Sequence, residues 1–468
     1  MLEKFLNIFR VPDLRTRVLF TLGLLAIYRL GAHIPTPGIN ADLLQQFFNS
    51  QQGGFLNLVD LFNGGNLRRL TIFALGIMPY ITASIIFQLL TVVYEPLAKL
   101  QKEGEVGRKK ITQWTRYVTV ILSAVQSFAI ALQLERGSSG AGGFVTHPGW
   151  GFRLMCMLTL TTGSAFIMWL GEQITERGVG NGMSLLIFAG IVVGLPNGIG
   201  DLWTKVENQT WGAFTVPAIV LLVGIMLLVV GFIVYVESSE RRIPVQYAKR
   251  VVGRRVMGGG STHLPLRVNS GGVMPVIFAS SILTFPVLLL SMFPSIAKSR
   301  YVQPMIDALK GGEPLYVLFY VLAIIFFAYF YVSIVFRPND MADNMRKYGG
   351  FIPGIRPGKR TADFINDVMT RITFVGALYL IVISLIPMIL IGGIHLQNLP
   401  FVGGAFDRMP TWVTHGLGLN FYFGGTSLLI VVGVAMDTVK QVESQLIMRH
   451  YEGFSRNAKL RSRGPRTW

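Results

Sequence analysis

The chain has 468 residues, of which 51% are hydrophobic and only 14% are charged, and its formal net charge is +18. Soluble globular proteins carry about 25% charged residues, so this composition excludes cytosolic enzymes, and its apolar content excludes disordered proteins. A single cysteine, Cys156, excludes an internal disulfide and a Cys-x-x-Cys metal or redox motif.

Ten apolar segments follow one another along the chain, separated by polar stretches that contain Gly and Pro. A helix needs roughly 20 apolar residues to cross a hydrocarbon core of ~30 Å, and each segment approaches or exceeds that length. We therefore predict an all-α polytopic membrane protein with ten transmembrane helices. The predicted spans are 18–35, 73–93, 115–134, 152–171, 183–200, 213–236, 272–293, 314–336, 372–391 and 420–436.

The orientation of the spans follows from the distribution of Lys and Arg. The first span follows a basic stretch, as in a signal peptide, but no small-x-small cleavage site follows it, so we expect a retained span. The termini and the even-numbered connections carry nearly all of the positive excess, whereas the opposite face is nearly neutral. Because basic loops stay in the cytoplasm, both termini are predicted to be cytoplasmic.

Segment 55–72, before the second span, is too short and too broken to cross a membrane alone. Apolar spacing in its first half gives way to Gly64-Gly65 and then to Arg68-Arg69. Irregular backbone at membrane depth is tolerated where protein or a water-filled cavity satisfies it. The segment either folds back into a funnel and plugs it, or lies as an amphipathic helix on the outer surface.

Two basic loops, 237–271 and 337–371, are longer than a connection between spans requires. Both combine clustered Arg and Lys with Gly/Pro turns and aromatic residues. This composition favours a structured, positively charged platform that would attract RNA phosphates or an acidic protein. The alternative is a pair of solvated loops that obey the positive-inside rule.

The sequence contains an internal repeat. GIMPYITASII (76–86) and GVMPVIFASSI (272–282) are identical at seven of eleven positions and lie in the second and seventh spans. Each half of the chain then holds five spans, and an odd number inverts the second half relative to the first. The predicted halves are 1–200 and 201–468. The shared Gly and Pro are expected to weaken each helix near one end, and the small residues after them suit a separable seam.

Signatures of enzymes are missing from the chain. It contains no G-x-x-x-x-G-K-[ST] and no H-E-x-x-H, and its six histidines lack metal-ligand spacing. GIGD (198–201) matches the Gly-x-Gly-Asp of intramembrane aspartyl proteases, but the chain has no Tyr-Asp partner for it. We therefore predict no enzyme activity, no cofactor and no metal.

Charge is nearly missing from the predicted spans, with Arg29 close enough to a span end to snorkel. Coupled transporters usually need buried ionisable groups, so a secondary transporter with inverted repeats is the weaker alternative. A conduit lined by aliphatic side chains, driven by an outside energy source, fits better.

The sequence closely resembles the SecY family, the central subunits of the bacterial protein-conducting channel. Three blocks carry the match: 73–90 (FALGIMPYITASIIFQLL), 168–188 (MWLGEQITERGVGNGMSLLIF) and the pair 261–282 and 337–373. Segment 421–437 matches the last span, so the resemblance covers essentially the whole chain. It implies two inverted five-helix halves around an hourglass pore that opens sideways to lipid between spans two and seven.

The resemblance also implies roles for particular residues. The hydrophobic pore ring would be Ile77, Ile81, Met183, Ile187, Ile277 and Ile430, with Met183 replacing the usual Ile or Val. The lateral gate would include Ser84, Gln88, Asn269 and Ser280; the two amides either bond across the seam or make ordinary interhelical contacts. The plug would include Asn63, Gly64, Gly65 and Arg68. Cytoplasmic docking would use Arg254, Arg255 and Arg356.

The implied partners are the small membrane subunits SecE and SecG, the motor ATPase SecA, the ribosome, an unfolded preprotein or signal peptide, and membrane lipid. The implied location is the bacterial inner membrane.

Overall fold

The structure is a computed structural model, and it describes residues 11–40, 42–45, 64–137, 145–207, 215–247, 250–252, 255–257, 260–292, 303–304, 313–392 and 425–461. The chain divides into two compact units by contact. The first comprises Met1–Gln52, Leu56–Leu195 and Ile430–Trp468, and the second comprises Gly53–Phe55 and Pro196–Leu429. The predicted halves describe chain order and inverted topology, and they stay a prediction.

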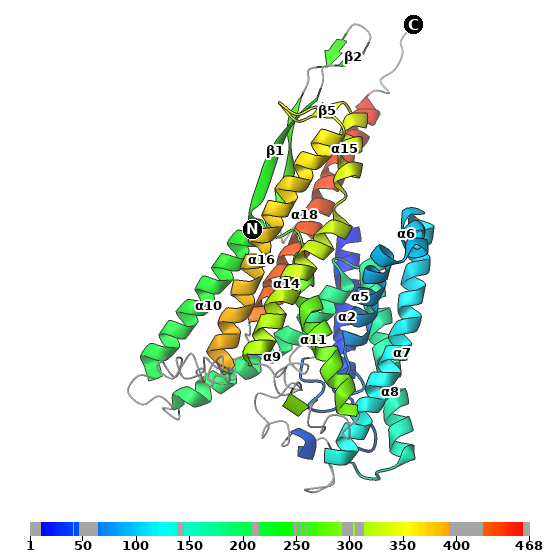
Figure 1. Cartoon of the computed structure of the whole chain (residues 1–468), viewed down its shortest axis with the longest axis vertical. Coiled ribbons are helices and arrows are strands. Elements are labelled where there is room, and N and C mark those ends of the chain that lie inside the picture. The colour runs from blue at the N-terminus through cyan, green and yellow to red at the C-terminus, as the bar shows by residue number, and fades with distance from the viewer. Residues whose placement is uncertain are drawn as a thin grey trace. The chain divides into compact units, whose positions relative to one another are not determined.

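Each of the ten predicted spans overlaps one long helix of the described residues (Figure 1). The helices are α2 (Pro12–Gly31), α5 (Met78–Val93), α7 (Glu105–Gly137), α8 (Trp150–Arg177), α9 (Gly182–Glu207), α10 (Thr215–Ser238), α11 (Met274–Met292), α14 (Pro314–Val335), α16 (Lys359–Gly392) and α18 (Gly425–Arg461). By length and composition, five helices in the described ranges are able to cross a membrane, or six if α5 and α6 (Glu95–Lys102), which meet at 99°, form one bent span.

Several helices extend beyond the apolar segment that predicted them. α7 begins at Glu105 and α16 at Lys359, well before the predicted spans at 115 and 372. Hydropathy detects only the part of a helix that matches the hydrocarbon core, whereas charged residues continue the same helix into water. α5, in contrast, begins at Met78 rather than at 73, because the preceding residues form turns.

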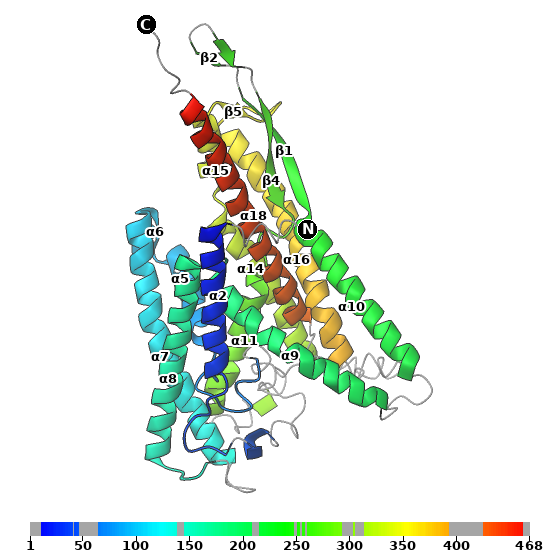
Figure 2. The same cartoon turned by 180° about the vertical axis from the view of Figure 1, so that it is seen from behind.

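In the first unit, α7 packs along α8, and α5 and α2 join this pair (Figure 2). Small polar residues recur at every fourth position of α7, and each is buried and donates its hydroxyl to its own helix backbone. They are Thr115, Thr119, Ser123 and Ser127. Small side chains with satisfied hydroxyls let neighbouring helices approach closely, which explains this tight bundle.

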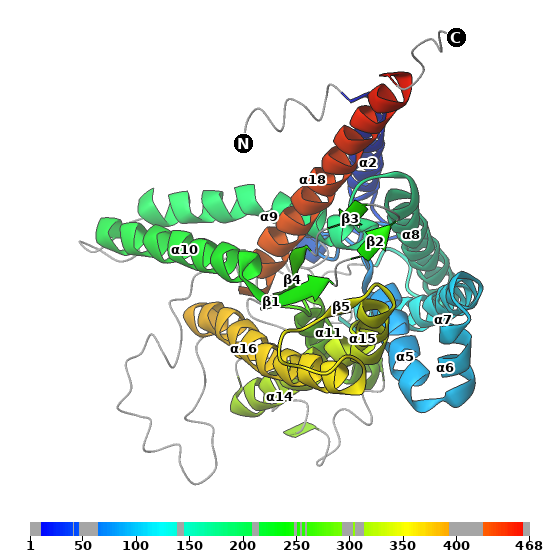
Figure 3. The same cartoon turned by 90° about the horizontal axis from the view of Figure 1, so that it is seen from above.

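In the second unit, α14 contacts both α11 and α16 (Figure 3). Phe278 of α11 and Phe327 of α14 are both buried, and their rings meet edge to face with centroids 5.8 Å apart. Such pairs prefer this geometry because the positive ring edge meets the negative face. The aromatic contact therefore ties the second repeat helix to its neighbour.

The two long basic loops form a small mixed element rather than isolated coils. β1 (Glu240–Tyr247) pairs with β4 (Ser261–Arg267) on one side and with β5 (Gly350–Phe351) on the other, all antiparallel. β2 (Arg250–Val252) pairs with β3 (Arg255–Met257), and α15 (Pro338–Lys347) precedes β5. The strands were not predicted, although alternate burial of Ile243 and Val245 reflects a period-two pattern in the sequence.

Candidate functional site

The two repeats adopt the same local backbone. Gly76 and Gly272 both have φ of 57°, a left-handed conformation that favours glycine. Each helix then begins two residues later, α5 at Met78 and α11 at Met274. The repeat detected in the sequence is therefore a repeated turn that starts a helix.

The proline of each repeat helps to start the helix. Pro79 and Pro275 are the second residues of α5 and α11. Proline suits the first turn of a helix because its missing N–H would have no partner there. The expectation that Gly and Pro weaken an existing helix is wrong in this respect: they set the point where it begins.

The six residues expected at a pore ring are aliphatic side chains that lie in helices or next to a helix start. Ile77, Ile81, Ile187 and Ile277 are each 7% exposed, and Ile430 is 1% exposed. Met183 is half-buried, and its sulfur lies over Gly171 of α8. Five of the six belong to the first unit and Ile277 to the second, so their convergence stays a prediction.

The turn between α8 and α9 fixes the start of the helix that carries Met183 and Ile187. The side-chain oxygen of Asn181 accepts a hydrogen bond from the Met183 backbone N–H at 3.1 Å. The Thr175 hydroxyl accepts from the Gly182 N–H at 2.9 Å. Thr21 of α2 accepts from the Val179 N–H at 3.0 Å. This turn therefore anchors the start of α9 through satisfied backbone donors.

The residues expected at the lateral gate make hydrogen bonds within their own unit, and those of Gln88 and Ser280 stay within their own helix. Gln88 donates to Ser84 Oγ on its own helix at 3.1 Å. Ser280 donates to the Ile277 carbonyl at 2.9 Å. Asn269 donates to Glu237 Oε1 at 2.6 Å and to the Gly272 carbonyl at 3.1 Å. Glu237, at the end of α10, was missed in the sequence, where it stands at the edge of a basic loop.

The described half of the expected plug segment consists of turns packed into the first unit. Gly64 and Gly65 have φ of 69° and 80°, and Leu67 and Leu70 are buried. A Cβ built on Gly64 would lie 2.6 Å from the carbonyl oxygen of Gly190 in α9, so the two backbones touch. Arg68 is half-buried. Asn63 and the rest of the segment before it lie outside the described residues.

The expected docking residues belong to the platform, which we define as loops 237–271 and 337–371. Its core contains Ile243, Leu266 and Ile352, which are 4%, 1% and 4% exposed. Arg356 is exposed, and its carbonyl accepts from the Thr361 hydroxyl at 3.0 Å. Arg255 lies in β3, and Arg254 lies outside the described residues.

An ion pair that the sequence did not suggest joins α7 and α8. Arg116 Nε donates to Glu172 Oε1 at 2.7 Å, and the two side chains are 44% and 15% exposed. Arg116 stands at the start of the third predicted span and Glu172 just after the fourth. Complementary charges at the adjoining ends of consecutive spans were the signal that could have indicated this pair.

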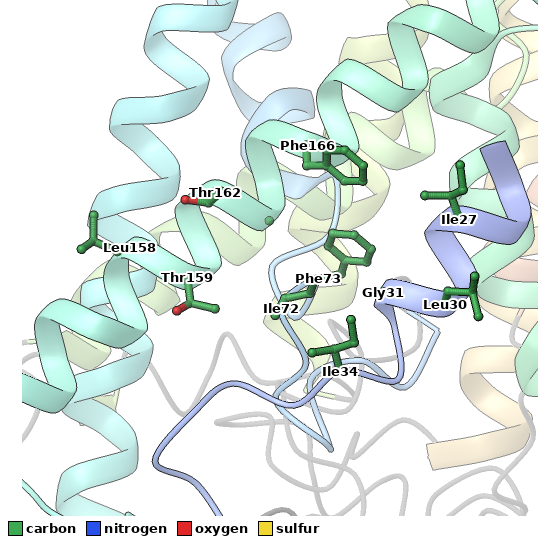
Figure 4. Close-up of a pocket in the computed structure, with 11 residues that line it drawn as sticks. Ile27, Leu30, Gly31, Ile34, Ile72, Phe73, Leu158, Thr159, Thr162 and Phe166 are labelled. Carbon is green, nitrogen blue, oxygen red and sulfur yellow. The ribbon is translucent and has the colours of Figure 1, made fainter.

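An apolar cavity of about 590 Å³ opens beside α2 and α8 of the first unit (Figure 4). Phe73 lies in it between Gly31 of α2 and Phe166 of α8, and the rings of Phe73 and Phe166 stack with centroids 6.0 Å apart. The Thr159 hydroxyl in its wall donates to the Met155 carbonyl. Among the described residues, those that line the cavity are apolar apart from Thr159 and Thr162.

No group of three or more His, Cys, Asp or Glu residues that could hold a metal ion occurs within the described ranges.

Comparison with known proteins gives consistent results. The family model described as SecY matches residues 71–439. The Protein translocase subunit SecY of Escherichia coli (strain K12) is 46% identical over 452 residues, which cover 97% of this chain and 96% of that protein. The Protein translocase subunit SecY of Streptomyces galbus is 46% identical over 466 residues, covering 97% of this chain and all of that protein (100%).

Solved structures share the fold at lower sequence identity. One described as "The structure of a protein conducting channel" has a TM-score of 0.61 at 17% identity and covers 92% of both chains. Sec61 in a canine ribosome-channel complex has a TM-score of 0.60 at 16% identity, again with 92% of both chains covered. With 46% identity over nearly its full length to curated relatives, the chain belongs to the SecY family.

Proposed function

We propose that the chain is the pore-forming subunit of a protein translocation channel, and that it is not an enzyme. It passes unfolded secretory polypeptides across the membrane and releases apolar segments sideways into lipid between α5 and α11. The near full-length similarity to curated translocase subunits carries this proposal. The repeated turn at Gly76 and Gly272, which starts both of these helices, supports it.

A ring of aliphatic side chains suits such a pore. Ile77, Ile81, Met183, Ile187, Ile277 and Ile430 together form the proposed constriction. An apolar constriction excludes water and ions when it is empty, and it yields to a passing polypeptide without reading its sequence. The plug, around Gly64, seals the resting channel. Ser84, Gln88, Asn269 and Ser280 border the seam, and a substrate segment leaves through it according to its own hydropathy.

The energy for translocation comes from a partner on the cytoplasmic face. Arg254, Arg255 and Arg356 of the platform dock the motor ATPase SecA or the ribosome, since a basic surface attracts RNA phosphates or an acidic protein. SecE and SecG complete the membrane complex. The protein lies in the bacterial inner membrane. Both termini lie in the cytoplasm, because basic segments stay on that side and the termini carry the positive excess together with the even-numbered connections.

Reconstitution tests the proposal directly. The chain is placed in liposomes with SecE and SecG, and SecA, ATP and an unfolded precursor are added outside. We expect ATP-dependent protection of the precursor from added protease. Arg356→Glu should lower protection while leaving insertion intact, whereas Arg177→Glu, at an exposed position at the end of α8, should not.

Absence of protection with correct insertion and active SecA would contradict the proposal. Saturable uptake of a small solute by the same liposomes would instead support a secondary transporter.

A further inference from the structure

A buried carboxylate and a buried amide meet where α10 ends and α11 is about to begin. Glu237 is 9% exposed and Asn269 is 5% exposed. Asn269 Nδ2 donates to Glu237 Oε1 at 2.6 Å, a short bond typical of a charged acceptor. The same amide nitrogen donates to the Gly272 carbonyl at 3.1 Å. One side chain therefore connects α10 to the left-handed turn that starts α11.

The hydrogen bond between Asn269 and Glu237 closes the base of the β1–β4 hairpin. Glu237 stands just before β1, which begins at Glu240, and Asn269 stands just after β4, which ends at Arg267. Between them, the Val268 N–H donates to the Ser239 carbonyl at 3.1 Å. The two ends of the hairpin are thus joined by a backbone bond and by a side-chain bond, so a displacement of the hairpin reaches both helices.

α16 restricts this junction from another side. A Cβ built on Gly376 would lie 2.8 Å from the Val268 carbonyl oxygen, so the backbone of α16 lies close to the chain between Glu237 and Asn269. Packed interiors resist small displacements because every shift meets neighbouring atoms. The close packing of α16 therefore limits how far Glu237 and Asn269 can move relative to each other.

The first repeat anchors its matching turn differently. Phe73 occupies the position that Asn269 holds in the second repeat, three residues before the glycine. Its ring stacks between Tyr28, at 5.7 Å, and Phe166, at 6.0 Å. Dispersion holds one turn and a charge-assisted hydrogen bond holds the other. The second anchor is more directional, because a hydrogen bond weakens steeply when its angle changes.

We propose that Glu237 is a positioning residue that holds the first turn of α11 in register with the base of the β1–β4 hairpin. Its carboxylate fixes Asn269, Asn269 fixes the turn at Gly272, and the turn fixes Ile277, whose N–H donates to the Val273 carbonyl at 3.3 Å. The consequence for sealing rests on the proposed function, in which Ile277 lines the constriction. A partner that docks on the platform then acts on Ile277 through this junction.

Hydrogen exchange of the assembled membrane complex tests the inference. The readout is the exchange rate of the Val276 and Ile277 amides, which bond within the first turn of α11. Glu237→Leu should raise this rate about tenfold or more, the usual effect of losing a hydrogen bond to a charged group. Glu237→Gln keeps an acceptor oxygen and should stay close to the wild-type rate. Glu103→Leu makes the same change at an exposed turn and should have no effect.

A double variant separates positioning from folding. Glu237→Leu leaves a buried amide without its acceptor, which destabilises the fold, whereas Glu237→Leu with Asn269→Leu replaces both partners by apolar groups. The double variant should unfold at a higher temperature than Glu237→Leu alone and still exchange faster than the wild type at Val276 and Ile277, because it also removes the Asn269 bond to the Gly272 carbonyl. It should also raise the resting ion conductance of the liposomes.

Wild-type exchange in either Leu variant would overturn the inference. The exchange result is independent of translocation: a wild-type complex that passes no precursor would contradict the proposed function and leave the role of Glu237 to be decided by exchange.

Discussion

The backbone of Gly64 lies against the backbone of Gly190 in α9. A Cβ built on Gly64 would stand 2.6 Å from the Gly190 carbonyl oxygen and 2.8 Å from its Cα. Gly190 follows Ile187 by about one helical turn. The middle of the proposed plug segment, at Gly64, therefore touches the helix that carries two residues of the proposed constriction, and the contact leaves no room for a side chain.

A comparison of Gly64→Ala with Gly65→Ala should distinguish the effect of this contact on ion conductance from the effect of backbone strain. Both glycines have positive φ, so alanine costs about 1 kcal/mol of left-handed strain at each. Only the Gly64 side chain would meet α9, since nothing lies within 4 Å of a Cβ on Gly65. We expect Gly64→Ala to raise the resting ion conductance of reconstituted liposomes well above that of Gly65→Ala. Equal conductance in the two variants would contradict a role for this contact in sealing.

Gly272→Ala should destabilise the second unit by about 1 kcal/mol, measured as thermal unfolding in detergent. The reason is conformational, because φ is 57° and a Cβ at this position would meet nothing within 4 Å. Gly224→Ala, in α10, also adds a Cβ in open space but in a helix. It should be neutral or stabilise the protein by roughly 0.4–1 kcal/mol. A stable Gly272→Ala protein would mean that the turn relaxes without glycine.

Each of the ten predicted spans overlaps a helix among the described residues because each is a long apolar run, and the number of membrane crossings stays a prediction. The sequence also revealed the repeat, because Gly76 and Gly272 share a positive-φ conformation that a residue with a side chain adopts only with strain. Helix ends were predicted less well. The start of α16 at Lys359 depends on local hydrogen bonds rather than on hydropathy, so an apolar window begins too late.

The anchors of the two repeats could not be predicted from the sequence. Glu237 is remote from Asn269 along the chain, and their contact depends on how the β1–β4 hairpin closes. The pairing of Arg116 with Glu172 was also missed, although complementary charges at the adjoining ends of the two spans could have indicated it. The pattern around Ile243 and Val245 alternates as in a strand, but it is short, and the charge of its neighbours obscured it. In each case the structure depends on contacts between residues that are far apart in the sequence.

Ile277→Asp should make the resting channel leak ions, because a carboxylate wets an apolar constriction. Ile282→Asp provides a control on the same helix: Ile282 is 42% exposed, whereas Ile277 is 7% exposed. Both variants place the same new charge in α11, which spans Met274–Met292, so the control includes the general cost of a carboxylate in this helix. We expect raised conductance in the Ile277 variant alone. Equal leakage from both would indicate general damage to the fold and remove Ile277 from the constriction.

Paired cysteines should test the junction of the two platform loops. Gln246 of β1 lies opposite Phe351 of β5, so Gln246→Cys with Phe351→Cys should form a disulfide under mild oxidation in a Cys156→Ala background. Ser261 of β4 lies opposite Gln246 on the other side of β1. Ser261→Cys with Phe351→Cys would therefore place the two cysteines two strands apart, at about 10 Å, too far for a bond. Mass spectrometry of the linked peptides distinguishes the two pairs, and a disulfide in the Ser261 pair would contradict the strand order β4-β1-β5.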